Sequence, residues 1–403
     1  MCIENFLKAE NMDKARLWTK DFVTVSVINF LVYLTHFLLM VTIASYAVDK
    51  FHASTKIAGL VAGIFIIGAL LGRLGTGRLI EDTGSKKVLM IGTFFFIITS
   101  LLYFAAIHLS LLIIIRLLHG IAFGAASTAT GTIVAQIIPS SRRGEGIGCY
   151  SMGAILSVAL GPFVGLFLIH GVDYNMIFVV TSVLAAGSFA LSFIVAKPAY
   201  LAPEPNQVSA VKSFQLSNFL EFKAIPISII ILVISFSYSG VLTFIPLYAK
   251  QIHLVEAASF YFLVYAVTVF FSRPLSGRLL DVRGANFVVY PCLLIYAVGM
   301  LLFSQASHGI ALLLAGVIIG LGYGNFTSSA QAISIKGLPP HRLGLATSTF
   351  FIFVDLGFGV GPYLLGSLAP FTGYRGLYLM MAIVILATIP LYYFLYGRKA
   401  SSE

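Results

Sequence analysis

Charged residues are scarce in this sequence. Aspartate, glutamate, lysine and arginine make up 10% of its 403 residues, whereas soluble globular proteins carry about 25%. Hydrophobic residues make up 59%, which is more than a soluble globule of this length can bury. The lack of charge excludes the soluble, disordered and fibrous classes and indicates a membrane protein.

The sequence also lacks the signatures of common enzymes and cofactor sites. Its three cysteines, Cys2, Cys149 and Cys292, have no spacing typical of a metal site or disulfide framework. It contains no GxxxxGK[ST] loop and no HExxH motif, and no run of basic residues accompanies the net charge of +10. We therefore expect no catalysis, no metal or other cofactor, no nucleic-acid partner and no direct use of ATP.

Twelve long apolar stretches account for most of the chain. A helix needs about 20 apolar residues to cross a hydrocarbon core, and no stretch shows the period-two alternation of a membrane β-barrel. Their approximate limits are 22–47, 57–77, 88–106, 110–138, 147–169, 175–196, 226–249, 258–277, 287–304, 310–335, 344–368 and 376–396. The sequence thus predicts an all-α membrane protein with twelve transmembrane helices.

Lysine and arginine are distributed unevenly between the loops. Eighteen lie in one set of alternate loops and termini, and four lie in the other set. Because loops retained in the cytoplasm carry the excess, we expect both termini in the cytoplasm and a multi-pass protein of the cell membrane. The other three bases, Arg73, Arg116 and Arg273, fall within spans or at their ends.

The two halves of the chain repeat each other with a shift of 200 positions. The matching pairs are Arg73 and Arg273, Gly77 and Gly277, Arg78 and Arg278, Gly84 and Gly284, Gly120 and Gly320, Gly124 and Gly324, Pro139 and Pro339, Arg142 and Arg342, and Gly161-Pro162 and Gly361-Pro362. A register shared through several spans and loops indicates two homologous six-helix bundles. Such bundles are typical of transporters that bind a solute between them.

The repeat predicts the organisation of the chain. We expect a cytoplasmic N-terminal segment at 1–21, six-helix bundles at 22–196 and 226–397, a cytoplasmic linker at 197–225 and a cytoplasmic tail at 398–403.

Several motifs at these positions resemble those of the major facilitator superfamily. Residues 72–87 read GRLGTGRLIEDTGSKK and resemble the signature between the second and third helices, with a degenerate copy at 273–284. The run RLLHG at 116–120 is similar to a motif of proton-coupled members that usually has Gln in place of His119. Residues 153–165 resemble the antiporter motif, found mainly in exporters. This resemblance covers essentially the whole chain and implies two bundles with pseudo-twofold symmetry, closest to the twelve-helix drug/proton antiporter branch.

The 77–87 loop and its copy contain candidate gating residues. Glu81 and Asp82 can approach the N-terminus of the eleventh helix, and Asp281 that of the fifth, where the helix dipole stabilises an acid by roughly 0.3–1 kcal/mol. Such contacts would close the inner side, although ordinary loop residues would show the same pattern. The candidates are Gly77, Glu81, Asp82, Gly84, Lys86, Lys87, Arg273, Gly277, Asp281 and Arg283.

Glycine and proline recur in the fifth and eleventh spans. Small residues let helices pack closely in lipid, and proline removes a backbone hydrogen bond, so we expect both helices to bend; packing alone is the alternative. The residues are Gly153, Gly161, Pro162, Gly165, Gly361 and Pro362. Because packing alone would explain these residues, the expected direction of transport, export, rests on the resemblance.

Few ionisable side chains lie inside the spans. Asp355 is the one acid near the middle of a span, and its counterpart 200 positions earlier is Ile155. Because an intramembrane charge is costly and marks function by default, Asp355 is a candidate for proton coupling or for binding a cationic solute. A permanent contact with a basic or polar neighbour is the alternative.

Three further side chains are candidates for proton coupling or substrate binding. Arg116 keeps its proton and acts as a fixed charge, while His119 shares its helix face and can titrate near neutral pH. His36 lies in the first span with Asn29, Tyr33 and Thr35, in what reads as a polar patch. The first span has no acid, unlike many proton-coupled exporters, which leaves the proton-binding residue open.

Aromatic residues make up 13% of the chain, which suits a cavity for flat, apolar or cationic compounds. The sequence therefore predicts a monomeric, proton-coupled transporter that exports small hydrophobic or cationic compounds of the multidrug type by alternating access. Its expected partners are the small-molecule substrate, protons and the lipid bilayer. The first alternative is an exporter of an endogenous metabolite such as a sugar, an amino-acid derivative or a metallophore. The next is an importer or a membrane sensor.

Overall fold

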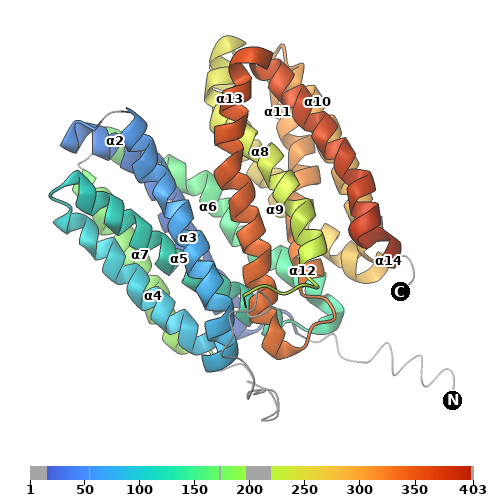
Figure 1. Cartoon of the computed structure of the whole chain (residues 1–403), viewed down its shortest axis with the longest axis horizontal. Helices are drawn as coiled ribbons and strands as arrows, with labels where there is room; N and C mark the ends of the chain where they lie inside the picture. Colours follow the sequence, from blue (N-terminus) through green and yellow to red (C-terminus); the bar gives the residue numbers. More distant parts are fainter. Residues whose placement is uncertain (1–15, 54, 172–173, 197–218, 401–403) are drawn as a thin grey trace.

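A computed structural model describes residues 16–53, 55–171, 174–196 and 219–400 (Figure 1). The regular elements within these ranges are all helices. Most of the predicted N-terminal segment, most of the linker and the end of the tail lie outside the described residues.

The first half of the chain, which we call the N half, contains the helices up to residue 194. They are α2 (Lys20–Phe51), α3 (Thr55–Thr83), α4 (Ser85–Leu102), η1 (Tyr103–Ala105), α5 (Leu109–Ile137), η2 (Ser140–Arg142), α6 (Arg143–Gly171) and α7 (Tyr174–Ile194).

The second half, the C half, repeats this order with more interruptions. Its elements are α8 (Ile225–Gln251), α9 (Val255–Arg283), α10 (Ala285–Ser304), α11 (Gly309–Ile319), η5 (Gly320–Gly324), α12 (Asn325–Ser334), η6 (Pro340–Arg342), α13 (Leu343–Tyr392), η7 (Tyr393–Gly397) and α14 (Arg398–Ala400).

Twelve segments of the described helices are long and apolar enough to cross a membrane, as the sequence predicts. Large apolar side chains cover the outer surface, among them Ile107, Phe271 and Phe394, which are more than 70% exposed. Apolar surface of this extent is unusual for a soluble monomer and suits contact with lipid.

The structure differs from the predicted spans in three places. The chain from Gly77 to Thr83 is the last part of α3, so the expected 77–87 loop shrinks to a turn at Gly84, whose φ of 88° favours glycine. The tenth span contains the π-helical turn η5. The eleventh and twelfth spans form one element, α13, interrupted only by non-helical dihedrals at Gly373 (φ 64°).

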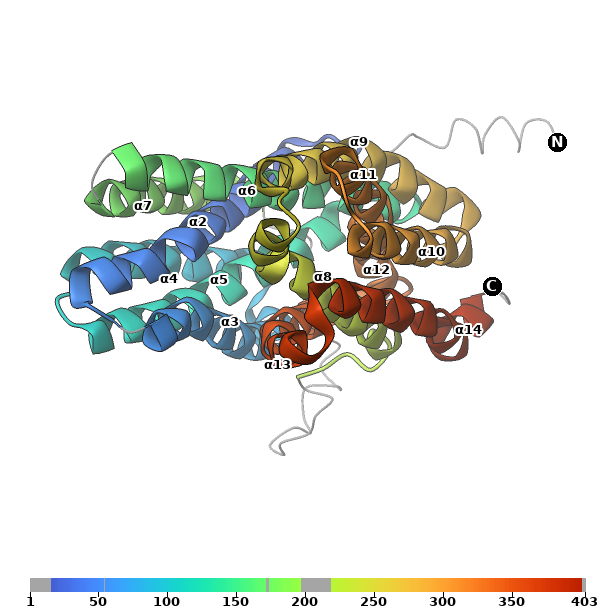
Figure 2. The same ribbon diagram turned by 90° about the horizontal axis from the view of Figure 1, so that it is seen from above.

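The two halves form two six-helix bundles. Within the N half α3 packs on α5 and α2 on α6, and within the C half α8 packs on α13 and α10 on α11. The halves meet mainly where α6 crosses α9 and where α3 crosses the first part of α13. Figures 1 and 2 show the halves side by side, close together at the lower end of Figure 1 and diverging towards its upper end.

We call the end where the halves converge the linker end. It carries the turns at Gly84 and Gly284 and the short helices η2 and η6. By chain order it is also the end at which the segment between α7 and α8 leaves and re-enters the bundles.

Candidate functional site

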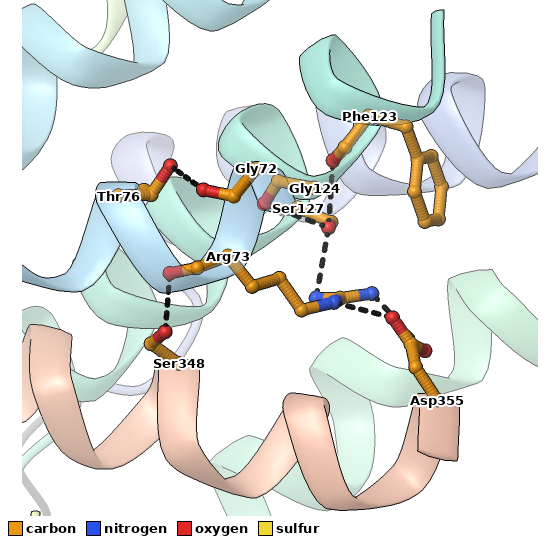
Figure 3. A network of polar contacts seen from close by, with 8 residues as sticks. All are labelled: Gly72, Arg73, Thr76, Phe123, Gly124, Ser127, Ser348 and Asp355. Atoms are coloured by element: carbon orange, nitrogen blue, oxygen red, sulfur yellow. Dashed lines mark hydrogen bonds and ion pairs between the residues drawn. The ribbon is translucent and has the colours of Figure 1, made fainter. Parts of the chain in front are cut away.

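An ion pair between Arg73 and Asp355 joins the two halves (Figure 3). Arg73 comes from α3 and Asp355 from α13, and their side chains are 1% and 17% exposed. The guanidinium Nε lies 2.7 Å from Oδ2 of Asp355, and Nη2 lies 3.5 Å from Oδ1. The sequence singled out Asp355, but it gave Arg73 only as part of the repeat.

The rest of Arg73 is held by polar and aromatic neighbours. Its Nη1 donates to Oγ of Ser127 at 3.2 Å, and Oγ of Ser348 donates to its backbone carbonyl at 2.5 Å. The guanidinium also lies over the rings of Phe351 and Phe123, at 4.6 and 5.7 Å from their centroids. An arginine in this setting is fixed in position and keeps its charge.

The arginine of the ion pair lies near the middle of a segment that is long and apolar enough to cross a membrane. Arg73 is ten residues before the end of α3 at Thr83, which corresponds to about 15 Å along a helix. The hydrocarbon core is roughly 30 Å thick. A buried pair at this depth is costly to separate unless one partner loses its charge.

At the linker end, Asp281 of α9 caps the N-terminus of α6. Its Oδ1 accepts from the amide of Gly144 at 2.7 Å, and its Oδ2 accepts from the amide of Glu145 at 3.0 Å. The backbones approach so closely that a Cβ on Gly277 would lie 2.4 Å from the carbonyl oxygen of Gly144. These contacts match the position that the sequence predicts for Asp281.

The corresponding contact of Glu81 is different. Its Oε1 lies 3.4 Å from Nη1 of Arg342, which belongs to η6, the turn before α13. Arg342 also donates from Nε to Oε2 of Glu221 at 2.7 Å. Glu81 is therefore next to the N-terminus of the eleventh span, as expected, but faces an arginine there, and Asp82 is exposed.

The basic residues of the candidate gate contact their own halves. Lys86 donates to the carbonyl of Phe193 at 3.3 Å, and Arg283 lies over the ring of Phe287 at 5.4 Å. Lys87 is exposed. Among the candidate gate residues, Glu81, Asp281, Gly77 and Gly277 make contacts across the halves.

A second polar cluster lies wholly inside the N half, around Arg116 and His119. Both side chains are 0% exposed. Arg116 donates to the carbonyls of Val61 and Ala62 at 3.2 and 3.4 Å and to the Tyr103 hydroxyl at 3.4 Å. Tyr103 is also 3.0 Å from Nδ1 of His119. The acceptors of Arg116 among the described residues are thus neutral.

His36 lies among aromatic rings, and the expected polar patch does not form. The His36 ring stacks on Phe65 at 4.5 Å, and Arg116 lies over the same phenyl ring at 4.6 Å. Within the described part of the chain, Nδ1 of His36 is buried with no hydrogen-bond partner. Asn29 instead accepts from Tyr150 and Thr130. Asn29 and His36 are seven residues apart on the same face of α2, but Asn29 bonds hydroxyls while His36 stacks on aromatic rings, and Thr35 bonds the carbonyl of Leu31.

The glycines of the fifth and eleventh spans allow close helix packing. A Cβ on Gly161 would lie 2.6 Å from Cβ of Phe37 on α2, and one on Gly361 would lie 1.9 Å from Oγ of Ser239 on α8. Gly153 packs against Phe30, and Gly165 is buried. Pro162 and Pro362 lie inside α6 and α13; the bends expected from them remain predictions.

Comparison with known proteins identifies relatives of the whole chain. The sequence pattern of the Major Facilitator Superfamily matches residues 25–309 and 255–403. An uncharacterised transporter of this type from Methanocaldococcus jannaschii is 25% identical, over 88% of this chain and 94% of its own length. The staphylopine export protein of Staphylococcus aureus is 22% identical, over 83% and 86%.

Two solved structures share the fold. A human organic anion transporter superposes with a TM-score of 0.75 at 14% identity, covering 92% of this chain and 98% of that chain. The proton:xylose symporter XylE superposes with a TM-score of 0.74 at 15% identity, covering 94% and 95%. The arrangement of two six-helix bundles with pseudo-twofold symmetry is thus common to all three proteins.

Proposed function

Since the chain belongs to the major facilitator superfamily, we propose that it is a secondary active transporter that exports small amphipathic compounds in exchange for protons. The observation that carries the proposal is the ion pair between Arg73 and Asp355. This pair connects the two bundles in mid-membrane, where alternating access requires them to separate and rejoin.

Protonation of Asp355 is the proposed coupling step. A neutral carboxyl loses most of its attraction for Arg73, which keeps its charge, so the α3–α13 contact weakens when the proton binds. Asp355 is 17% exposed, which gives a proton a route to it. One charge crossing a potential of 100 mV yields about 2.3 kcal/mol, enough for more than tenfold accumulation of a substrate.

The contacts of Asp281 and Glu81 are the proposed inner gate. The distribution of lysine and arginine places the linker end in the cytoplasm. With that orientation, Asp281 on the amides of α6 and Glu81 beside Arg342 hold the cytoplasmic side closed. We propose a monomer as the working unit, because the two halves of one chain supply both crossings.

The arginines inside the spans limit the class of substrate that we propose. The membrane core contains Arg73, Arg116 and Arg273, and of these only Arg73 has a carboxylate partner within the described ranges. This excess of positive charge argues against the permanently cationic part of the predicted substrate range. Hydrophobic multidrug-type compounds remain candidates, and the similarity to a staphylopine exporter supports the second candidate, an exporter of an endogenous metabolite.

Transport in everted membrane vesicles tests the coupling. A panel of amphipathic compounds is added to vesicles with an imposed proton gradient and a pH-sensitive dye, and compounds that release protons identify coupled export. Asp355→Asn is expected to abolish the proton signal of every active compound at normal expression. Glu256→Gln, at an exposed acid of α9, is the matched control and should behave as the parent protein. Parental proton flux in Asp355→Asn would reject the proposal.

A further inference from the structure

The two halves place an arginine at equivalent positions but give it different partners. Arg73 and Arg273 are related by the shift of 200 positions. Ser348 contacts the backbone carbonyl of Arg73, and its counterpart Gly148 lies against the carbonyl of Arg273, which a Cβ on Gly148 would approach to 3.0 Å. The α3–α13 and α6–α9 crossings therefore share their local geometry as well as their sequence register.

The acid present in one crossing is absent from the other. Asp355 follows Ser348 by seven residues, about two helical turns, and so shares its helix face. The residue in the same relation to Gly148 is Ile155, which is 5% exposed and apolar. The position from which Asp355 binds Arg73 is thus taken by a side chain that cannot accept a hydrogen bond.

Arg273 is left with unused donors. Its Nε donates to the carbonyl of Gly324 at 3.0 Å, and no other acceptor among the described residues bonds its guanidinium. The side chain is 4% exposed. A mid-membrane guanidinium in this state can bind a planar anion through two parallel hydrogen bonds.

Tyrosines gather beside this arginine. Tyr323 precedes Gly324, whose carbonyl accepts from Arg273. Tyr323 stacks on Tyr238 at 4.0 Å, and Tyr238 stacks on Tyr265 at 5.4 Å. Hydroxyl contacts link Tyr238 with Tyr265 and Tyr323 with Ser235. Arg273 lies close enough to Tyr265 and Tyr323 to interact with them electrostatically.

The N half has no such hydroxyls at the equivalent positions. The counterparts of Tyr238, Tyr265 and Tyr323 are Leu38, Phe65 and Phe123. The C half therefore has phenol groups near Arg273 where the N half has apolar side chains.

We propose that Arg273 forms an anion subsite that binds a carboxylate group of the transported compound. The substrate carboxylate takes at Arg273 the place that Asp355 takes at Arg73. This inference rests on the proposed transport function and narrows its substrate class to amphipathic acids.

Equilibrium binding to the purified full chain in detergent tests the subsite. The probes are 2-naphthoate, the neutral 2-naphthylmethanol and the cationic 2-naphthylmethylammonium, and the measurement is the ligand-induced shift of the thermal unfolding midpoint. Naphthoate should bind the parent protein more tightly than the other two. Arg273→Gln should weaken naphthoate binding at least about tenfold, and Arg273→Lys should weaken it less. Arg278→Gln, at an exposed arginine of the same helix, should leave it unchanged.

A variant that restores the missing acid provides a second test. Ile155→Asp should pair with Arg273 and abolish naphthoate binding while the protein remains folded. Adding Arg273→Gln to Ile155→Asp should lower the unfolding midpoint below that of Ile155→Asp alone, because the new carboxylate loses its partner.

The outcomes separate this inference from the proposed coupling. The subsite is rejected if naphthoate binds no better than its neutral and cationic analogues, or equally well to Arg273→Gln or Ile155→Asp. These assays need no proton gradient. A result that rejects coupling through Asp355 therefore leaves the subsite standing, and the reverse also holds.

Discussion

The crossings of α3 with α13 and of α6 with α9 occupy equivalent places and are stabilised differently. In the α6–α9 crossing, the backbones touch at Gly144 and Gly277, and Asp281 caps the end of the helix. The α3–α13 crossing adds a charged pair in mid-membrane, Arg73 with Asp355. Both crossings have close backbone contacts, whereas among the described residues an ion pair in the middle of the spans occurs only in the α3–α13 crossing. Under the proposed mechanism, the features that the two crossings share would allow the bundles to move, and the acid present in only one crossing would couple that movement to protons.

Removing Asp355 should make the two crossings alike, and we expect it to have the largest effect on stability of the substitutions proposed. Asp355→Leu leaves Arg73 buried without its partner and should lower the free energy of unfolding by about 3–5 kcal/mol. Thermal or denaturant unfolding of the purified protein measures this loss.

The control for this change removes both charges. The double variant Asp355→Leu with Arg73→Met should recover most of the lost stability, because a buried pair contributes little net stabilisation compared with apolar residues of similar volume. If Asp355→Leu alone is as stable as the parent, the pair does not hold the crossing.

Adding a methyl group to the α6–α9 crossing should open the linker end. Gly277→Ala places a Cβ 2.4 Å from the carbonyl of Gly144, an overlap that costs about 1–3 kcal/mol. Thiol labelling of Thr347→Cys, at a position 1% exposed between the halves, should become faster. Gly75→Ala, where a Cβ meets nothing within 4 Å, is the control, and equal labelling in both variants would contradict the closed contact.

The two gate acids should differ in strength. Asp281→Asn weakens two charge-assisted bonds to the amides of α6 and should favour opening by about 1–2 kcal/mol. Glu81→Gln weakens a longer, partly exposed contact with Arg342. This variant should change the free energy of opening by about 0–1 kcal/mol. The same labelling at Thr347→Cys ranks them, and a larger effect for Glu81→Gln would reverse the proposed order.

Much of the fold was predictable because it depends on composition and length. Apolar runs of helical length predict the twelve spans, and the repeat of 200 positions predicts the paired bundles. The shortened turn at Gly84 was missed, since a helix can continue through Gly77 and the charged residues after it once these lie at the membrane surface. The π-helical turn η5 depends on packing around Gly320–Gly324, which apolar periodicity does not encode.

The site was only partly predictable. The depth of Asp355 in its span made it a candidate, and Asp281 lies at a helix N-terminus, where the dipole stabilises an acid. The coupling and gating roles of these two acids stay predictions. The partner of Asp355 was missed, because Arg73 is 282 residues away and recurs in both halves, which made it look like scaffold. The sequence carries one signal for this pair: the acid occurs in a single half, while the arginine occurs in both. This difference identifies the pair only when the two crossings are compared in the structure.

Gly84 and Gly284 each join two long helices through a single residue of positive φ. Because each connection is a single residue, α4 must move together with α3, and α10 with α9, when the contacts at the linker end break. Both pairs present bulky apolar side chains on their outer surfaces, such as Phe95 on α4 and Phe287 on α10. If the bundles rock as proposed, the surrounding acyl chains must rearrange in each cycle, and we expect bilayer thickness to affect its rate.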